Sequence, residues 1–160
     1  MSDRYNNIFG SGPTGVLTTV LLWVVALQIS TWVSIPEMHI APTFRWVLIV
    51  LFSIDAAVLL VWSHIILPPS VRAKTLITKG PYQFVRHPVY AAFIWSGTGI
   101  MAMTYKSWLL IVFVIPIHIF WAWHVQKEEK HMIDKFGSAY ADYIKTTGQF
   151  FPRFIVGKKN

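Results

Sequence analysis

Residues 44–67 read FRWVLIVLFSIDAAVLLVWSHIIL and form the longest of four apolar stretches in the chain. Asp55 is the one acid in this stretch, which is followed directly by Pro68 and Pro69. A helix of roughly 20 mostly apolar residues crosses the hydrocarbon core of a bilayer, and proline prevents a helix from continuing. The stretch therefore predicts a membrane-spanning helix.

Three further stretches complete a set of four expected spans, at residues 15–35, 88–104 and 107–125. Residues 15–35 are longer than the apolar core of a signal peptide and end without a small-residue cleavage site, so we expect a retained span. The third span is short, close to the lower limit of about 17 residues. Pro116 predicts a kink in the last span.

The composition is typical of a membrane protein, because 54% of the 160 residues are hydrophobic and 13% are charged. A soluble domain of this length has too much surface to hide so much apolar area, so we expect the lipid bilayer as a partner. The formal net charge is +7. In a membrane protein this charge indicates basic cytoplasmic loops, and we expect no nucleic-acid partner. The chain has no cysteine, which excludes disulfides and thiolate metal sites.

Basic side chains predict the orientation in the membrane. The connection between the second and third spans carries four cations and no acid: Arg72, Lys74, Lys79 and Arg86. The segment after the last span carries seven cations: Lys127, Lys130, Lys135, Lys145, Arg153, Lys158 and Lys159. The positive-inside rule places both segments and both termini in the cytoplasm. The expected location is a prokaryotic inner membrane.

These features predict an all-α integral membrane protein with a single domain, residues 1–160. Its expected architecture is a bundle of four transmembrane helices with a short cytoplasmic C-terminal helical cap at residues 126–154. Within the cap we expect a helix through residues 126–131, a break at Gly137, and a second short helix capped by Ser138.

Small side chains in the third span predict close helix packing. Ala92, Ser96 and Gly99 lie on one face of the expected helix. Small residues at this spacing allow the backbone of another helix to approach closely, so we expect a neighbouring helix on this face.

The strongest chemical signal is GPYQFVRHPVY, at residues 80–90. Pro88 suits the first turn of a helix, where its missing N–H is not needed, and the free N–H groups of that turn suit an anion or a carboxylate. A membrane anchor of cations and interfacial aromatic residues explains Arg86 alone. It does not explain a histidine and two tyrosines around the same turn, so we expect a binding site here.

Two adjacent acids, Glu128 and Glu129, follow the fourth span in a segment that is otherwise basic. One interpretation is a solvated helix face that pairs with Lys127 or Lys130 and contributes little to stability. The other is a carboxylate that receives a cationic or amino-bearing ligand. The two residues alone leave both interpretations open.

Residues 10–15, GSGPTG, match the dinucleotide-binding pattern G-x-G-x-x-G. The pattern has that meaning between a strand and a helix of a βαβ unit. A membrane span follows it here, so we interpret it as a flexible lead-in and expect no nucleotide site.

Two motifs of the chain resemble the isoprenylcysteine carboxyl methyltransferase family, which is related to the membrane phospholipid methyltransferases. The first motif is LITKGPY at residues 76–82, followed by RHPVY at residues 86–90. The second begins at the two acids and continues to FPRF at residues 151–154. The resemblance covers residues 74–154, and it is specific because both motifs occur in this order around two spans.

The resemblance implies that the chain binds S-adenosylmethionine without a Rossmann domain, at the cytoplasmic ends of the last spans and beneath the C-terminal segment. The cofactor-binding positions that it implies are Lys74, Thr75, Leu76, Ile77, Tyr82, Arg86, His87, Pro88, Val89, Tyr90, Glu128 and Glu129. His87 and His124 are the candidate catalytic residues, because an amine acceptor needs a base that removes a proton. No metal site is expected.

The expected function is methyl transfer from S-adenosylmethionine to a lipophilic or small carboxylate, thiol or amine acceptor at the cytoplasmic membrane face. Such a transfer needs positioning and a dry site more than a strong acid or base. Two positions depart from the family pattern. Ala92 stands where a glycine is common, and His124 stands where a substrate-contacting arginine is found. These departures bear on a prenylcysteine substrate more than on the cofactor.

Three further ionisable residues, Asp55, His64 and His118, lie deep inside the expected spans. Such residues mark functional sites by default, and interhelical hydrogen bonding is the alternative. His64 and His118 also suggest a second function, a haem-binding membrane anchor for electron transfer, which a Soret band would reveal. A small transporter is a third class, but the first and third spans offer mostly Thr, Ser and Gln as polar lining.

Overall fold

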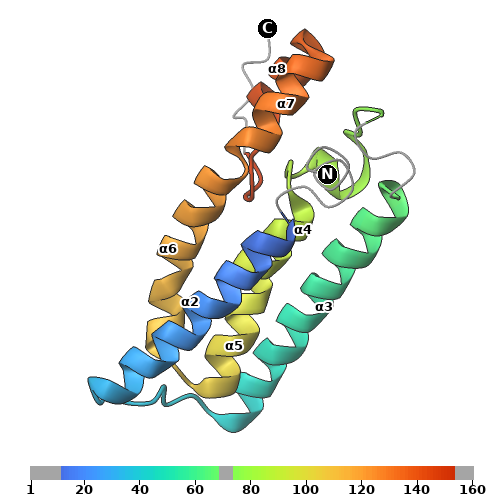
Figure 1. Cartoon of the computed structure of the whole chain (residues 1–160). Coiled ribbons are helices and arrows are strands. Elements are labelled where there is room, and N and C mark those ends of the chain that lie inside the picture. The colour runs from blue at the N-terminus through green and yellow to red at the C-terminus, as the bar shows by residue number, and fades with distance from the viewer. Residues whose placement is uncertain (1–11, 69–73, 154–160) are drawn as a thin grey trace, which may run out of the picture.

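The computed structural model describes residues 12–68 and 74–153, and all regular elements in these ranges are helical. They are α2 (Gly12–Trp32), α3 (Pro42–Ile66), η1 (Gly80–Gln83), α4 (Pro88–Ala91), η2 (Ala92–Gly97), α5 (Thr98–Tyr105), α6 (Trp108–His124), α7 (Gln126–Phe136) and α8 (Ser138–Thr146). Figure 1 shows α2, α3, α5 and α6 side by side as a bundle, with α7 and α8 beyond one end.

Among the described residues, three helices are long and apolar enough to cross a membrane: α2, α3 and the continuous helix Trp108–Phe136, which joins α6 to α7. The expected spans at residues 15–35 and 44–67 correspond to α2 and α3, with bounds shifted toward the N-terminus. Both helices expose many large apolar side chains. A water-soluble surface rarely carries apolar patches of this extent, whereas a lipid-facing surface does.

The expected span at residues 88–104 is a helical rod built from α4, η2 and α5, and it is not one of these three helices. Its middle element, η2, is a π-helix, in which the hydrogen bonds join residues five apart. No single α-helix of spanning length therefore forms here. A bundle of four transmembrane helices stays a prediction at this segment.

Small residues on this rod bring the neighbouring helices close, as predicted. A methyl group on Gly99 would lie 2.8 Å from the ring of Phe52 in α3. The side chain of Ser96 is buried and its hydroxyl donates a hydrogen bond to Asp55 of α3. Asp55 therefore serves an interhelical hydrogen bond, which was one of the two interpretations of its place in a span.

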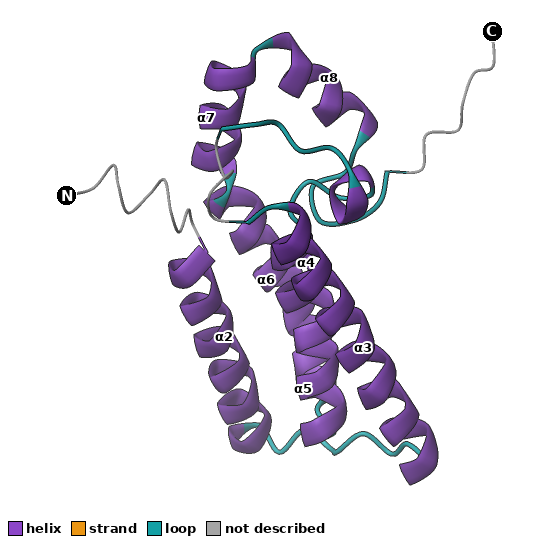
Figure 2. Ribbon diagram, turned by 90° about the vertical axis from the view of Figure 1, so that its right-hand side faces the viewer, coloured by secondary structure: helices purple, strands orange, loops and turns teal. Residues whose placement is uncertain are grey.

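The chain after α6 continues as α7 and α8 beyond the end of the bundle at which α4 begins (Figure 2). The helix that contains α6 continues through residues 126–131 as predicted. These six positions are all polar or charged, so α7 lies outside the apolar part of this continuous helix. Gly137 adopts a positive φ of 56° and ends α7, also as predicted. The expected cap by Ser138 is wrong. Ser138 is the first residue of α8, and the preceding Gly137 makes the turn without a side-chain hydrogen bond.

Residues 147–151, here called the return segment, bring the chain back from α8 to the start of α4. The backbone N–H groups of Arg86 and His87 donate to the carbonyl oxygens of Gly148 and Gln149 at 2.8 and 3.0 Å. A methyl group on Gly148 would lie 1.8 Å from the carbonyl oxygen of Phe151. Glycine is therefore required for the backbone to pass this closely.

Candidate functional site

Five of the predicted site residues lie together, on α4 and the turn before it and on the first turn of α7: Arg86, His87, Tyr90, Glu128 and Glu129. The Nε and Nη2 atoms of Arg86 lie 2.9 and 2.8 Å from Oε1 of Glu129. Nε2 of His87 lies 3.1 Å from the same oxygen. Two predicted motifs that are about 40 residues apart in sequence thus form one charged cluster, which we call the Arg86–Glu129 cluster.

Glu129 is the enclosed acid of the pair. Its side chain is 15% exposed and that of Arg86 is 9% exposed. Burial alone would raise the pKa of Glu129, but the hydrogen bond from His87 and the charge of Arg86 outweigh it and hold the pKa at about 2. Glu129 is therefore ionised at neutral pH, and its charge balances a buried guanidinium.

Glu128 is the more open acid. Its side chain is 34% exposed. The hydroxyl of Tyr90 donates to Oε2 of Glu128 at 3.2 Å, and Nδ1 of His87 lies 3.9 Å from Oε1. The sequence left the roles of the two acids interchangeable. The geometry separates them, because Glu129 faces a protein cation, whereas Glu128 is more exposed and lies beside the rings of His87 and Tyr90.

Aromatic rings continue the site from the cluster into the bundle. The ring of His87 stacks on that of Tyr90 at a centroid distance of 5.5 Å, and Tyr90 stacks on Trp121 of α6 at 4.4 Å. Tyr90 thus stacks on both His87 and Trp121, and this stack joins the carboxylates to the core of the bundle.

The resemblance implied a C-terminal segment over the site, but the contacts that the return segment makes there were not among the predicted ones. Nη1 of Arg86 donates to the carbonyl oxygen of Thr147. Phe150 is buried and its ring lies 5.7 Å from that of His87. Tyr143, before the segment, donates from its hydroxyl to the carbonyl oxygen of Tyr82, and burial raises its pKa, which keeps it protonated. Gly148 was the available signal, since a glycine after a helix often permits a close return of the chain.

The other predicted cofactor residues lie around the cluster. Pro88 begins α4 and is buried, as predicted for a proline in the first helical turn, and Val89 beside it is half-buried. Tyr82 is half-buried in η1. Four residues precede η1 in a loop, of which two are exposed and two half-buried: Lys74, Thr75, Leu76 and Ile77. Within the described residues, none of these four is hydrogen-bonded to the cluster, so their role stays a prediction.

His124, the second catalytic candidate, lies at the end of α6. Its Nε2 is 3.0 Å from the hydroxyl oxygen of Thr14 in α2, and its ring stacks on Phe120 at 5.0 Å. Its ring also meets the edge of Trp121 at 5.8 Å. His124 is therefore joined to the cluster through Trp121 and Tyr90.

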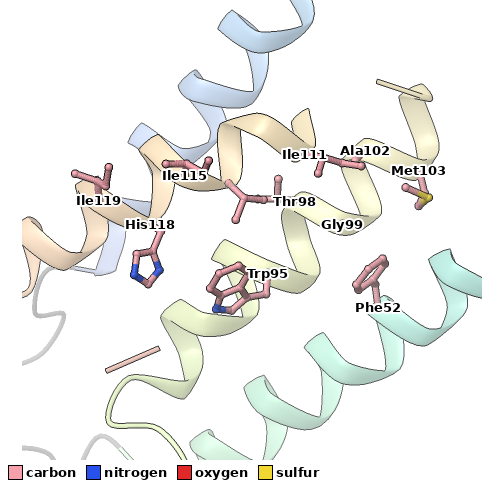
Figure 3. A pocket seen from close by; sticks show the side chains of 11 residues that line it. Phe52, Trp95, Thr98, Gly99, Ala102, Met103, Ile111, Ile115, His118 and Ile119 are labelled. Carbon is pink, nitrogen blue, oxygen red and sulfur yellow. The ribbon is translucent and has the colours of Figure 1, made fainter. Parts of the chain in front are cut away.

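An apolar cavity of about 520 Å³ lies between α3, α5 and α6 (Figure 3). It is lined by Phe52, Trp95, Thr98, Gly99, Ala102, Met103, Ile111, Val114, Ile115, His118 and Ile119. His118 stands at one end, and its Nδ1 is buried without a hydrogen-bond partner among the described residues. The ring of Phe150 lies 5.5 Å from that of His118 on one side and contacts His87 on the other. Phe150 therefore separates the cavity from the Arg86–Glu129 cluster.

Three helices of membrane-spanning length with a charged, aromatic-lined cluster at one end define a membrane protein with a polar site at the end of its helices. Residues 32–134 match the model of the isoprenylcysteine carboxyl methyltransferase (ICMT) family, and the chain belongs to this family. The two motifs that suggested the resemblance are the ones that form the cluster.

Curated relatives agree with this assignment. The protein-S-isoprenylcysteine O-methyltransferase of Saccharomyces cerevisiae is 28% identical over 57% of this chain and 38% of its own length. The mouse protein of the same name is 29% identical over 61% of this chain and 34% of its own length. The cobalt-zinc-cadmium resistance protein CzcN of Cupriavidus metallidurans is 30% identical over 49% of this chain and 36% of its own length. The chain thus spans little more than a third of the length of these relatives.

Family membership does not support the haem-binding anchor that His64 and His118 suggested. The two histidines also have different surroundings. His64 is exposed on α3, whereas His118 lines the cavity between Trp95 and Phe150. They therefore do not present themselves as a matched pair of ligands.

Proposed function

We propose that this chain is a membrane methyltransferase that uses S-adenosylmethionine and methylates a lipophilic or small acceptor. The observation that carries the proposal is the Arg86–Glu129 cluster, in which both family motifs meet at one end of the bundle. The yeast and mouse relatives, which are named as O-methyltransferases, support the same reaction class.

The residues present fit the cofactor chemically. S-adenosylmethionine carries an ammonium group, a sulfonium group and ribose hydroxyls. The open carboxylate of Glu128 suits the ammonium group or the hydroxyls. The half-buried ring of Tyr90 lies beside that carboxylate and would border the bound cofactor. Arg86 is already paired with Glu129, so we assign it to holding the site together instead of to cofactor contact.

When bound, the cofactor would supply an electrophilic methyl group, which the acceptor takes by attacking the methyl carbon in line with the departing thioether sulfur. The protein's part is to position both partners and to exclude water. His87 is 7% exposed and lies against Phe150, so this edge of the site is dry. A carboxylate acceptor needs no base. For a thiol or amine acceptor, His87 or His124 would take the proton.

The cavity supports a lipophilic acceptor. Its lining is almost entirely apolar, and three of its residues on α6, Ile111, Ile115 and Ile119, are also exposed on the outer surface of the helix. In a bilayer that surface faces acyl chains. An apolar group that enters from the lipid between α3 and α6 would reach His118 and then Phe150, next to the cluster.

The finer topology is also part of the proposal: four spans, with the cluster and both termini in the cytoplasm. The charge of the connections at the far end of the bundle supports this topology. Lys106 is paired there with Glu37 at 2.9 Å, so its positive charge is balanced. We expect reporter fusions at Lys79 and Asn160 to give cytoplasmic signals and a fusion near Glu37 to give an external signal. An external signal at Asn160 would remove the four-span topology.

Methyl transfer itself is tested with methyl-labelled S-adenosylmethionine. We expect purified protein in nanodiscs to incorporate label into a membrane-lipid or small-thiol extract. His87→Ala should reduce incorporation at least tenfold, on the order of the contribution of a positioned acid–base residue. Lys130→Gln, an exposed change on the same helix as the acids, should not alter it. Equal incorporation by wild type and His87→Ala would contradict a reaction at this cluster.

A further inference from the structure

Helix α2 ends at residue 32, where the family-matched segment begins. Its first turns nevertheless pack against the end of α6 that lies at the site. Gly15 lies directly against the ring of Trp121, where an added methyl group would be 2.2 Å from the ring. The hydroxyl oxygen of Thr14 lies 3.0 Å from Nε2 of His124. Two residues of α6 next to the site are therefore contacted from α2.

The contact between Thr19 and Trp121 is the most closely defined of these. Both residues are fully buried. The indole N–H of Trp121 donates to the hydroxyl oxygen of Thr19 at 2.8 Å, and that hydroxyl donates in turn to the carbonyl oxygen of Gly15 at 2.8 Å. Donor and acceptor directions of the hydroxyl are thus both used. A tryptophan ring whose single polar atom is held in this way has a fixed orientation.

Trp121 in turn contacts the residues of the site. Its ring stacks on Tyr90 at 4.4 Å with an interplanar angle of 25°, and the hydroxyl of Tyr90 donates to Glu128 at 3.2 Å. We infer that Thr19 is a positioning residue of the site, which sets the ring of Trp121 and through it the place of Tyr90 and Glu128. The inference rests on the proposed function, because it concerns how these two residues receive S-adenosylmethionine.

Thr19→Val is the sharpest test, because valine keeps the shape of threonine and removes its hydroxyl. The buried indole N–H then loses its acceptor, and the ring must turn to find another. We expect the affinity for S-adenosylmethionine, measured by calorimetry in nanodiscs, to fall about tenfold. Thr19→Ser retains the hydroxyl and should bind within about twofold of wild type.

Thr18→Val is the matched control. Thr18 is the preceding residue, and its hydroxyl binds the carbonyl oxygen of Thr14 within α2. This variant should bind like wild type. A loss of affinity in Thr18→Val equal to that in Thr19→Val would assign the effect to helix α2 in general and would overturn the inference.

A double-mutant cycle with Tyr90→Phe separates positioning from a general loss of structure. Tyr90→Phe removes the hydrogen bond to Glu128, so Thr19→Val should then weaken binding by less than about twofold further. An undiminished tenfold loss in that background would show that Thr19 does not act through Tyr90. If Thr19→Val does not fold, Trp121→Phe replaces it in the cycle, because it leaves no unpaired indole N–H.

A ligand-free measurement makes the contact itself visible. In protein with labelled tryptophan, the indole resonance that disappears in Trp121→Phe should move in Thr19→Val and stay in Thr18→Val. If wild-type protein binds no S-adenosylmethionine, both the proposed function and this inference are wrong. If wild type and Thr19→Val bind it equally well, only this inference is wrong.

Discussion

Glu129→Gln is expected to destabilise the fold by about 3–5 kcal/mol, the range seen when one partner of a buried ion pair is removed. The change keeps the shape of the side chain and leaves the guanidinium of Arg86, which is 9% exposed, without a counter-charge. Thermal or denaturant unfolding in nanodiscs measures the effect. Glu128→Gln is the matched control. It should change the free energy of unfolding by less than about 1 kcal/mol, because Glu128 is partly solvated.

The pH dependence follows from the same pair. The pKa of Glu129 is lowered from an ordinary value of 4.5 to about 2, so the folded state holds the ionised form more strongly than the unfolded state does. The stabilisation is complete above pH 4.5 and is lost as the pH falls from 4.5 toward 2. In Glu129→Gln this acid-dependent loss should be absent. Wild-type stability in Glu129→Gln at neutral pH would show that the pair does not hold the site together.

Glu128→Gln is expected to weaken S-adenosylmethionine binding tenfold or more while the fold stays intact. A hydrogen bond to a charged group contributes on the order of 1.5–3 kcal/mol, and about 1.4 kcal/mol is a factor of ten in affinity. Calorimetry in nanodiscs measures the dissociation constant. Lys130→Gln changes an exposed charge two residues along the same helix and should have no effect. Equal affinity in all three proteins would mean that the acid is a solvated helix face.

Much of the arrangement could be predicted from local patterns. Apolar runs of spanning length predict α2, α3 and α6, because lipid requires continuous apolar faces. The first motif precedes the third expected span and the second follows the fourth. Two consecutive spans bring the chain back to the same side of the bundle, so the two motifs were expected to meet at one end. Pro88 is the first residue of α4, as predicted, because the first turn of a helix does not need the N–H group that proline lacks.

The remaining features depend on contacts between distant residues, which local patterns do not encode. The return segment reaches Arg86 through backbone atoms, and backbone hydrogen bonds carry no side-chain signature. The different roles of Glu128 and Glu129 depend on which side of α7 faces Arg86, and one residue of helical rotation exchanges them. From sequence alone, Trp121 is indistinguishable from any lipid-facing or core tryptophan. Its hydrogen bond to Thr19 becomes apparent only in the structure.

Equilibrium binding of S-adenosylmethionine to the purified wild-type protein tests the central claim, that the Arg86–Glu129 cluster holds this cofactor. We expect saturable binding at a single site in nanodiscs, weakened at least tenfold in His87→Ala, because His87 contacts both glutamates and stacks on Tyr90. Absence of saturable binding to the wild-type protein, or equal affinity in His87→Ala, would contradict it.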